Sequence, residues 1–394
     1  MSDPEPREQQ AAGDPPEGRR PPLYPRSTAR WLLALAPWSV AVLLVVLARA
    51  APGAVEGLYS RGLYPLIAWT VGQVGRGWAA LTGSALRSGR SPSLSEVGLV
   101  VAAVGGCWAL RRAWVRGGAA GAARLMLAAT GGGALVFLLL WGLNYSRMPL
   151  AVSLDLEPLG ASSDELDQVA AILEAQLAVD LEGLQLAGAS ETPAEALRVA
   201  QEAWREAGER TTALGPDAGV VVRPALSGVL VGAGISGVFS PFTQEAHVAG
   251  HLPRPDLLFT ACHELAHARG WAREDEANYL AWRVGSRASN HRLRAAARLL
   301  ALGHVLGALG RADRAALVAR LERLDPRIEA ALEERGRFWD RERSPAASRA
   351  ATAVNDAYLR SQGQDGVASY GRMVDLLVAE WRAAGERLPA GDPR

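Results

Sequence analysis

The chain has 394 residues, 49% of them hydrophobic, and its 42 basic residues almost balance its 41 acidic ones. This near-zero net charge argues against a nucleic-acid-binding protein, whose domain would be strongly basic. Two cysteines exclude a disulfide framework and a multi-cysteine metal cluster, and the absence of lysine excludes chemistry that depends on a lysine amine.

Residues 1–30 are rich in proline, glycine, glutamate and arginine and contain few apolar side chains. Such a segment buries too little apolar surface to fold, so we expect a disordered tail. The length of the whole chain suggests two or three structural units, which must lie after this tail.

Residues 31–147 are far more apolar and are predicted to form a membrane domain. Crossing a bilayer takes about 20 apolar residues. Residues 62–75 are apolar but short and contain Pro65, so whether they cross the membrane is left open. The remaining candidates predict three transmembrane helices, at 31–48, 97–110 and 125–146.

The placement of arginines indicates how these spans are oriented. Cytoplasmic loops carry an excess of basic residues. We therefore expect a multi-pass protein of the cell membrane, with the tail in the cytoplasm, the lipid bilayer as a partner and residues 148–394 on the extracytoplasmic side. The basic residues that decide this precede the first span or lie between the last two: Arg19, Arg20, Arg26, Arg30, Arg111, Arg112, Arg116 and Arg124.

Residues 148–394 have the pattern of a mainly helical α+β domain. Capping boxes at 162–165 and 192–195 predict helices over 163–185 and 193–208. Valines and glycines between 220 and 248 predict two or three short strands with turns. Helical patterns then continue almost to the C-terminus. The expected fold is an α-helical membrane anchor followed by a helical domain with a small sheet.

Residues 256–271 contain the one motif that carries recognisable chemistry. Asp256 can cap the start of a helix and Gly270 can end it. His263 and His267 are four residues apart and share a face, so their imidazoles can reach one tetrahedral ion. Glu264 stands where a general base for water is needed. This H-E-x-x-H pattern predicts a Zn²⁺ site of the hydrolytic type.

A catalytic zinc site needs a third protein ligand. Glu274 and Asn278 would share a face of the next helix, so Glu274 could bind the metal while Asn278 holds the outer nitrogen of a histidine. Glu276 points about 200° away from Glu274 on a helix, so both cannot face the metal. Glu274 is the preferred ligand, and Glu276 remains the alternative.

Several stretches together resemble the bacterial family catalogued as domain of unknown function 3810, which consists of membrane-anchored proteins with an H-E-x-x-H site. The resemblance implies a zincin-like, zinc-peptidase-like domain. Segment 274–278 is also similar to the third-ligand segment of zinc peptidases that use a glutamate, although only six residues separate it from His267. In metzincins, Gly270 would match the turn glycine and Arg273 the third ligand. The matching stretches are 141–147, 234–246, 263–267, 274–278, 358–360 and 369–371.

These observations predict a membrane-anchored zinc peptidase that acts on a peptide or protein substrate, with Glu264 as general base. Residues 238–247 are expected to supply an edge strand on which an extended peptide could pair. The alternative is a non-catalytic zinc-binding membrane sensor or scaffold. The residue that stabilises the oxyanion is not chosen by the sequence; the candidates are His247, His251, Tyr279, Tyr370 and Arg372.

Overall fold

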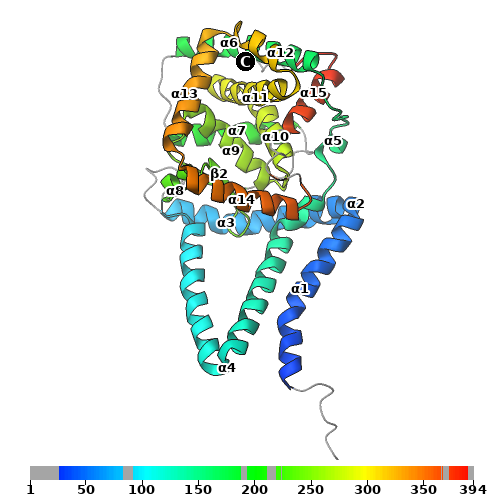
Figure 1. The fold of residues 1–394 in the computed structure, drawn as a ribbon, viewed down its shortest axis with the longest axis vertical. Coiled ribbons are helices and arrows are strands. Elements are labelled where there is room, and N and C mark those ends of the chain that lie inside the picture. The colour runs from blue at the N-terminus through cyan, green and yellow to red at the C-terminus, as the bar shows by residue number, and fades with distance from the viewer. Residues whose placement is uncertain are drawn as a thin grey trace, which may run out of the picture.

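The computed structural model describes residues 26–82, 92–187, 193–210, 219–222, 224–364, 366 and 372–388. The predicted tail lies outside these ranges except for residues 26–30, which already form the first turn of a helix. Figure 1 shows a helical body with long helical arms extending from one side of it. The described part is mainly helical and contains one small sheet, as the sequence predicts.

The arms are α1 (Arg26–Ala50) and α4 (Leu94–Leu140). Gly118 has a φ of 58°, a conformation that residues with a side chain rarely adopt, and it turns α4 back on itself into two antiparallel halves (Figure 1). The second and third predicted spans are therefore two halves of one hairpin. Trp38 of α1 packs onto Gly131 of α4 and donates a hydrogen bond to the Leu127 carbonyl over 3.1 Å.

Both arms expose their apolar side chains, including Leu33 and Val101. Continuous apolar surface of this extent is typical of segments that contact lipid. Both helices are long and apolar enough to span a bilayer, which identifies a membrane protein. A third helix of this kind, α11 (His291–Ala312), is largely buried inside the body. The sequence predicts this helix as part of the core, and the structure confirms it.

The base of the body is formed by α2 (Pro52–Ala54), η1 (Val55–Leu63) and α3 (Tyr64–Thr82), and Figure 1 shows α3 lying across the arms. The open question about residues 62–75 is answered here, because they run from η1 into α3. Pro65 stands at the start of that helix, where a missing N–H breaks no hydrogen bond. Helix α3 is not among the described helices apolar enough to span a membrane.

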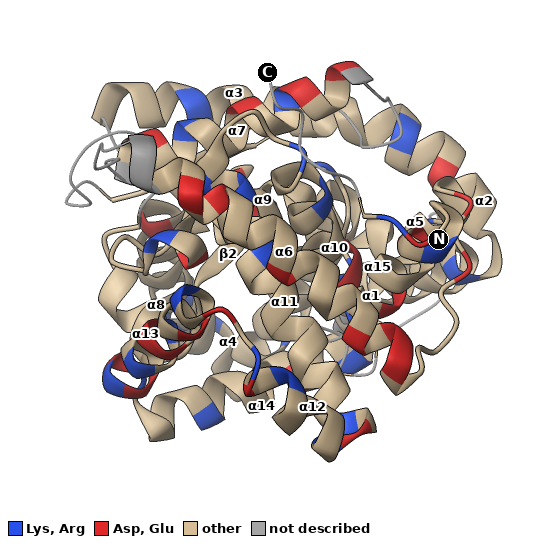
Figure 2. Cartoon of the chain, turned by 90° about the horizontal axis from the view of Figure 1, so that it is seen from above, with Lys and Arg blue, Asp and Glu red and all other residues tan. Residues whose placement is uncertain are grey.

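The body is built from helices that pack around one apolar core. The capping box of Ser162 and Glu165 is confirmed by their reciprocal hydrogen bonds. Basic and acidic residues are interspersed over the ribbon in the view of Figure 2. The elements not yet mentioned are η2 (Gly142–Ser146), α5 (Leu150–Ser153), α6 (Ser163–Ala187), α7 (Pro193–Arg210), α9 (Arg254–Ala268), α10 (Glu274–Gly285), α12 (Arg314–Leu321), α13 (Pro326–Glu342), α14 (Pro345–Ser361) and α15 (Met373–Ala383).

The sheet contains β1 (Val220–Val222), β2 (Gly237–Ser240) and β3 (Glu245–Val248) in the order β1-β3-β2. Strand β3 pairs parallel with β1 and antiparallel with β2, so β2 is an edge strand. Between β1 and β2 the valine-rich sequence predicts strand, but a short helix forms instead, α8 (Ser227–Gly232). The carboxylate of Glu96, far away in the sequence, accepts hydrogen bonds from the N–H groups of Ala225 and Leu226 at the start of that helix.

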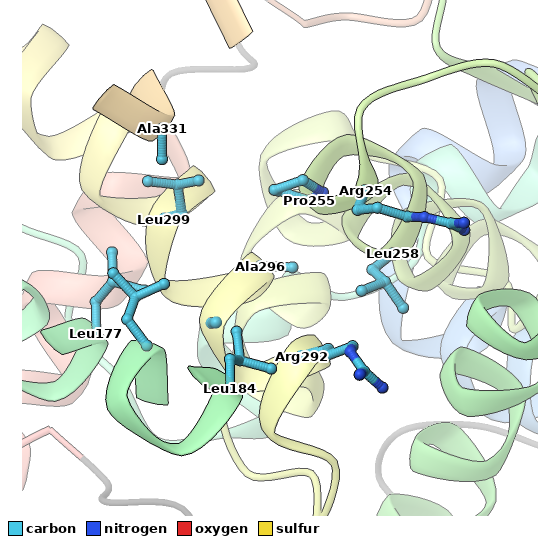
Figure 3. A pocket seen from close by; sticks show the side chains of 11 residues that line it. Leu177, Leu184, Arg254, Pro255, Leu258, Arg292, Ala296, Leu299 and Ala331 are labelled. Atoms are coloured by element: carbon cyan, nitrogen blue, oxygen red, sulfur yellow. The ribbon is translucent and has the colours of Figure 1, made fainter. Parts of the chain in front are cut away.

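An apolar cavity of about 460 Å³ lies between α6, α9, α11 and α13 (Figure 3). None of the three predicted metal ligands lines it. Its walls include Leu177, Leu184, Leu258 and Leu299. The cavity is therefore separate from the motif that carries the chemistry.

Candidate metal centre

Helix α9 carries the H-E-x-x-H motif and is buried from Asp256 to its end. The expected cap at Asp256 is wrong, because Pro253 stands at the N-cap and Asp256 lies inside the first turn. The Asp256 carboxylate instead accepts hydrogen bonds from Arg335 and Trp339 on α13. This contact anchors the start of the motif helix to the outer helix α13.

The end of α9 is set by Gly270, as the sequence predicts. Its φ of 84° suits a glycine, and its N–H donates to the His267 carbonyl while the Trp271 N–H donates to the Ala266 carbonyl. This pair of hydrogen bonds is the Schellman arrangement that ends many helices. The sharp reversal lets the chain start α10 only a few residues later, which explains how a short connection can bring Glu274 back to the histidines.

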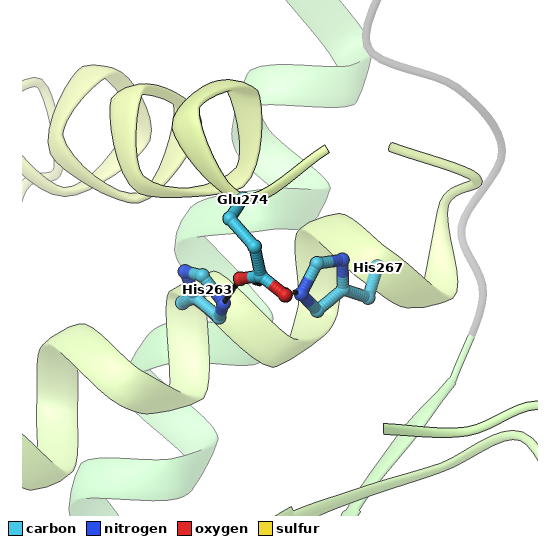
Figure 4. A group of neighbouring side chains, drawn as sticks. All are labelled: His263, His267 and Glu274. Carbon is cyan, nitrogen blue, oxygen red and sulfur yellow. Dashed lines mark ion pairs between the residues drawn. The ribbon is translucent and has the colours of Figure 1, made fainter. Parts of the chain in front are cut away.

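His263, His267 and Glu274 converge on one point from α9 and α10 (Figure 4). Glu274 Oε2 lies 3.2 Å from His263 Nε2 and 3.5 Å from His267 Nε2. All three side chains are buried. The structure therefore brings together the three residues that the sequence selects as ligands.

The outer nitrogens of both histidines are held by acceptors. His263 Nδ1 lies 2.8 Å from Asn278 Oδ1, and His267 Nδ1 lies 2.7 Å from the Trp271 carbonyl oxygen. A carbonyl oxygen can only accept, so His267 Nδ1 carries the proton. Its Nε2 then presents a lone pair in the neutral ring, and the Asn278 contact favours the same tautomer in His263. The expected contact between Asn278 and a motif histidine is thus confirmed.

This arrangement fits a tetrahedral metal ion. Two ligands bound to zinc at about 2.0–2.1 Å in tetrahedral geometry lie roughly 3.3 Å apart. The two distances from Glu274 Oε2 to the histidines are close to that value. Glu274 Oε2 is also buried and has no hydrogen-bond partner among the described residues. Two lone pairs and a carboxylate oxygen that converge in a buried place are stabilised by a cation between them.

The charges of the three groups perturb one another strongly. Burial opposes charging of His267, but the adjacent Glu274 carboxylate outweighs it and raises the pKa of His267 to about 9. Burial likewise opposes ionisation of Glu274, yet the two imidazoles hold the pKa of that carboxyl well below its usual range. Glu274 is therefore available as an anionic ligand.

Glu264 lies beside this group, with a carboxylate that is almost completely buried. Burial, reinforced by the negative charge of Glu274, raises the pKa of Glu264 to about 7, which suits a group that takes up and releases a proton near neutral pH. Its Oε2 has no hydrogen-bond partner among the described residues. A Cβ on Gly237 of β2 would lie 2.6 Å from Glu264 Oε1, so only glycine lets the edge strand pass this close.

Glu276, the alternative third ligand, points elsewhere. Its Oε1 accepts hydrogen bonds from the Leu150 N–H over 2.7 Å and from Arg273 over 2.9 Å. Arg273 also donates to the Arg147 carbonyl, and it is turned away from the metal position. These contacts tie α10 to the segment after the third span and explain why Glu276 is buried without facing the histidines.

The oxyanion candidates named from the sequence lie in separate places. His247 on β3 contacts the Val238 carbonyl and Ser93, and His251 stacks against Phe338. Tyr279 donates to Glu380 on the far side of α10. Arg372 stands at the N-cap of α15, and Tyr370 lies outside the described residues.

Tyr358 on α14 is a candidate that the sequence reasoning did not assign. Its ring lies 6.0 Å from Tyr145, whose ring lies 5.3 Å from Trp141, and Trp141 packs edge-on against His267 at 5.8 Å. Burial, with a smaller contribution from the Glu274 charge, raises the pKa of Tyr358 to about 12, so the phenol keeps its proton. Only the three-dimensional fold brings α14 to this place, although its Tyr-Leu-Arg stretch is one of the family-like motifs.

The membrane part supplies one wall of the site. Trp141, which follows the last residue of α4, donates a hydrogen bond to the His267 carbonyl over 3.0 Å. Tyr64 of α3 donates to the Ala268 carbonyl over 2.8 Å. Arg147 joins the two parts further, because it pairs with Glu56 and donates to the Gly270 carbonyl. The motif helix therefore ends directly on the membrane-proximal elements.

Comparison with known proteins yields one match. The model of a family described as "Protein of unknown function (DUF3810)" matches residues 59–378, which is more than half of the chain and confirms the resemblance seen in the motifs. No curated protein and no solved structure matches the chain.

Proposed function

The chain belongs to the DUF3810 family of proteins of unknown function, and we propose that it is a zinc-dependent peptidase anchored in the membrane. The observation that carries the proposal is the convergence of His263, His267 and Glu274 on one point, with Glu264 beside it. Two histidines and one carboxylate that leave a fourth position open are the ligand set of catalytic zinc sites. A purely structural site would need no buried glutamate next to the ligands.

In this proposal His263, His267 and Glu274 hold the metal. Zinc at that place would make water nucleophilic near neutral pH and polarise a carbonyl group. Glu264 takes a proton from the attacking water and passes it to the leaving amine. The C–N bond of the peptide breaks as the water oxygen joins the carbonyl carbon, which leaves a carboxylic acid and an amine. Tyr358 is the candidate donor to the developing oxyanion.

We further propose that α1 and the two halves of α4 are the three spans and that the body lies on the extracytoplasmic side. The start of α1 and the turn of α4 lie at the same end of the arms, since Arg124 stacks over the ring of Trp31 at 5.3 Å. Both basic groups therefore belong to one side of the bilayer, and the tendency of arginines to stay inside makes that side cytoplasmic.

The proposal is tested with the full-length protein in lipid nanodiscs. Metal content and cleavage of a peptide library are measured for the wild type, for Glu264→Gln and for a variant of each ligand. We expect about one zinc per chain in the wild type and in Glu264→Gln, loss of zinc in His263→Ala, His267→Ala and Glu274→Ala, and cleavage by the wild type alone. Controls are Glu322→Gln, at an exposed glutamate, and His251→Ala, at a histidine outside the motif.

Two results would contradict the proposal in different ways. Stoichiometric zinc without any cleavage, in the wild type as in Glu264→Gln, would favour the alternative of a non-catalytic zinc-binding sensor or scaffold. Folded protein that contains no zinc would exclude every function that depends on this metal.

A further inference from the structure

The candidate metal centre lies where the membrane arms enter the body. Trp141 closes α4 and contacts His267 both through its ring and through a hydrogen bond to the His267 carbonyl. Aromatic residues of this kind mark the membrane–water interface at the ends of spans. The distance between the end of the third span and a metal ligand is therefore the length of one side chain.

Exposed apolar side chains gather on the elements at this level. Helix α3, which lies across the arms in Figure 1, exposes Leu66 and Trp69. Helix α8, beside it in the same view, exposes Leu226 and Val229. Groups of exposed apolar residues mark contact with a membrane or a partner. Since the arms continue from this side of the body, the occupant we assign to this surface is the interfacial layer of the bilayer.

Edge strand β2 belongs to the same region and passes over the general base. Its Gly237 lies so close to Glu264 that an added Cβ would be 2.6 Å from the carboxylate. No strand of the described residues pairs with the side of β2 that faces away from β3. Because Ser236 accepts a hydrogen bond from Ala249 on β3, the alternation of an antiparallel ladder turns the backbone groups of Gly237 and Phe239 toward that open side.

The side chains along this edge are apolar and exposed. Val238 on β2 is 48% exposed, and Phe242 in the turn that follows is 53% exposed. An extended peptide that adds to the edge of a sheet is bound through its backbone and selected by side-chain contacts such as these. A peptide paired with β2 would cross Glu264 at the level of the bilayer surface.

We propose that the substrate is a peptide segment that directly adjoins a transmembrane helix and is cut close to the bilayer surface. This inference rests on the proposed peptidase function and names its substrate class. A substrate held in the same membrane is presented at high effective concentration, so the site needs few contacts with its sequence. An extended chain covers about 3.3–3.6 Å per residue, so bonds within roughly the first ten residues beyond a span are within reach.

The test uses full-length protein in proteoliposomes with a designed substrate library. Each member carries a model transmembrane helix, a randomised ten-residue segment, and a spacer of 0, 15 or 30 Gly/Ser residues between the two. The same randomised segments are also supplied as soluble peptides. We expect cleavage in the library without a spacer, and at least a tenfold lower rate with the longest spacer and with the soluble peptides.

Variants localise the effect to the proposed surface. Val238→Glu and Phe242→Glu are expected to lower cleavage of the tethered segment at least tenfold while zinc content is kept. Val318→Glu on α12 places the same charge at a similarly exposed valine in another part of the body and is expected to change nothing. Equal rates for the two glutamate variants and for Val318→Glu would remove β2 and its turn from the proposal.

The outcomes separate this inference from the proposed function. Cleavage that depends on Glu264 but is equally fast for soluble and tethered segments would overturn the substrate class and leave the peptidase standing. If nothing is cleaved, photo-crosslinking of the Glu264→Gln variant to the same library decides. Crosslinks to β2 from the tethered segments alone would uphold the membrane-bound ligand class without peptidase activity, and their absence would overturn both proposals.

Discussion

His267 owes its orientation to the chain that follows it rather than to a distant partner. The Trp271 carbonyl that accepts from its Nδ1 belongs to the turn that ends α9. His263 is held differently, by the side-chain oxygen of Asn278 on α10. Hydrogen bonds to the outer nitrogens of ligating histidines fix their tautomer and orientation and tune metal affinity. The two ligands therefore depend on different kinds of support, and mutation can separate them.

Asn278→Ala is expected to weaken zinc binding by about 10–100-fold, the usual effect of losing such a supporting contact. Asn278→Asp keeps an acceptor for His263 Nδ1 and is expected to retain most of the affinity. Zinc affinity is measured by competition with a chelator of known strength. Asn290→Ala, which removes the N-cap of α11, serves as a control that affects stability alone. Full zinc affinity in Asn278→Ala would mean that His263 is oriented by packing.

Tyr358→Phe removes one hydroxyl group and is expected to reduce kcat by about 10²–10³-fold, as for the loss of one donor to an oxyanion. Zinc content and KM should change little, because the ring and its contacts remain. Tyr279→Phe is the matched control, since its hydroxyl is engaged with Glu380. A larger loss in Tyr279→Phe than in Tyr358→Phe would return the role to the residue named from the sequence.

Among the elements, the turn between α9 and α10 decides whether the site can form. Gly270 has a φ of 84°, and a Cβ there would lie 3.0 Å from the Tyr64 ring. The same turn supplies the Trp271 carbonyl to His267. One glycine thus sets the end of a helix, the contact with α3 and the position of a metal ligand.

Gly270→Ala is expected to lower the free energy of unfolding by about 1–2 kcal/mol, because a left-handed conformation is costly for a residue with a side chain. It should also lower zinc affinity, since the Trp271 carbonyl shifts relative to His267. Gly385→Ala carries the same kind of backbone strain, with nothing within 4 Å of the added Cβ. It is expected to lower stability without changing zinc affinity. Equal zinc affinity in the two variants would uncouple the turn from the metal centre.

The elements that the sequence predicts correctly are those that local signals determine. The H-E-x-x-H spacing, the glycine that ends α9 and the shared face of Glu274 and Asn278 all depend on residues close together in the chain. Helix α8 was missed because Glu96, far away in the sequence, holds its first N–H groups. Tyr358 was missed as a site residue because nothing near it in the sequence indicates that α14 returns to the metal centre. Tertiary contacts of this kind leave no local pattern.

On the scale of the whole molecule, the membrane arms and the body are joined by buried polar contacts. Glu245 on β3 accepts hydrogen bonds from the N–H groups of Leu94 and Ser95 at the start of α4. At the other end of the hairpin, Arg147 pairs with Glu56 and lies 3.7 Å from the Trp271 ring centre. Both ends of the α4 hairpin are therefore fixed to the elements that surround the site, which holds the site at a constant height above the bilayer.

This connection makes the orientation of the hairpin decide on which side of the membrane the site works. Residues flanking Gly118 lie at the far end of the arms, away from the body (Figure 1). In a variant with Cys107→Ala and Cys262→Ala, a new cysteine at Ala119 should react with a membrane-impermeant maleimide only after permeabilisation. A new cysteine at Glu322, on the body, should react in intact spheroplasts. The basic residues near Ala119 favour this orientation because cytoplasmic loops carry excess arginine. The reverse labelling pattern would place the metal centre, and any peptide it cuts, in the cytoplasm.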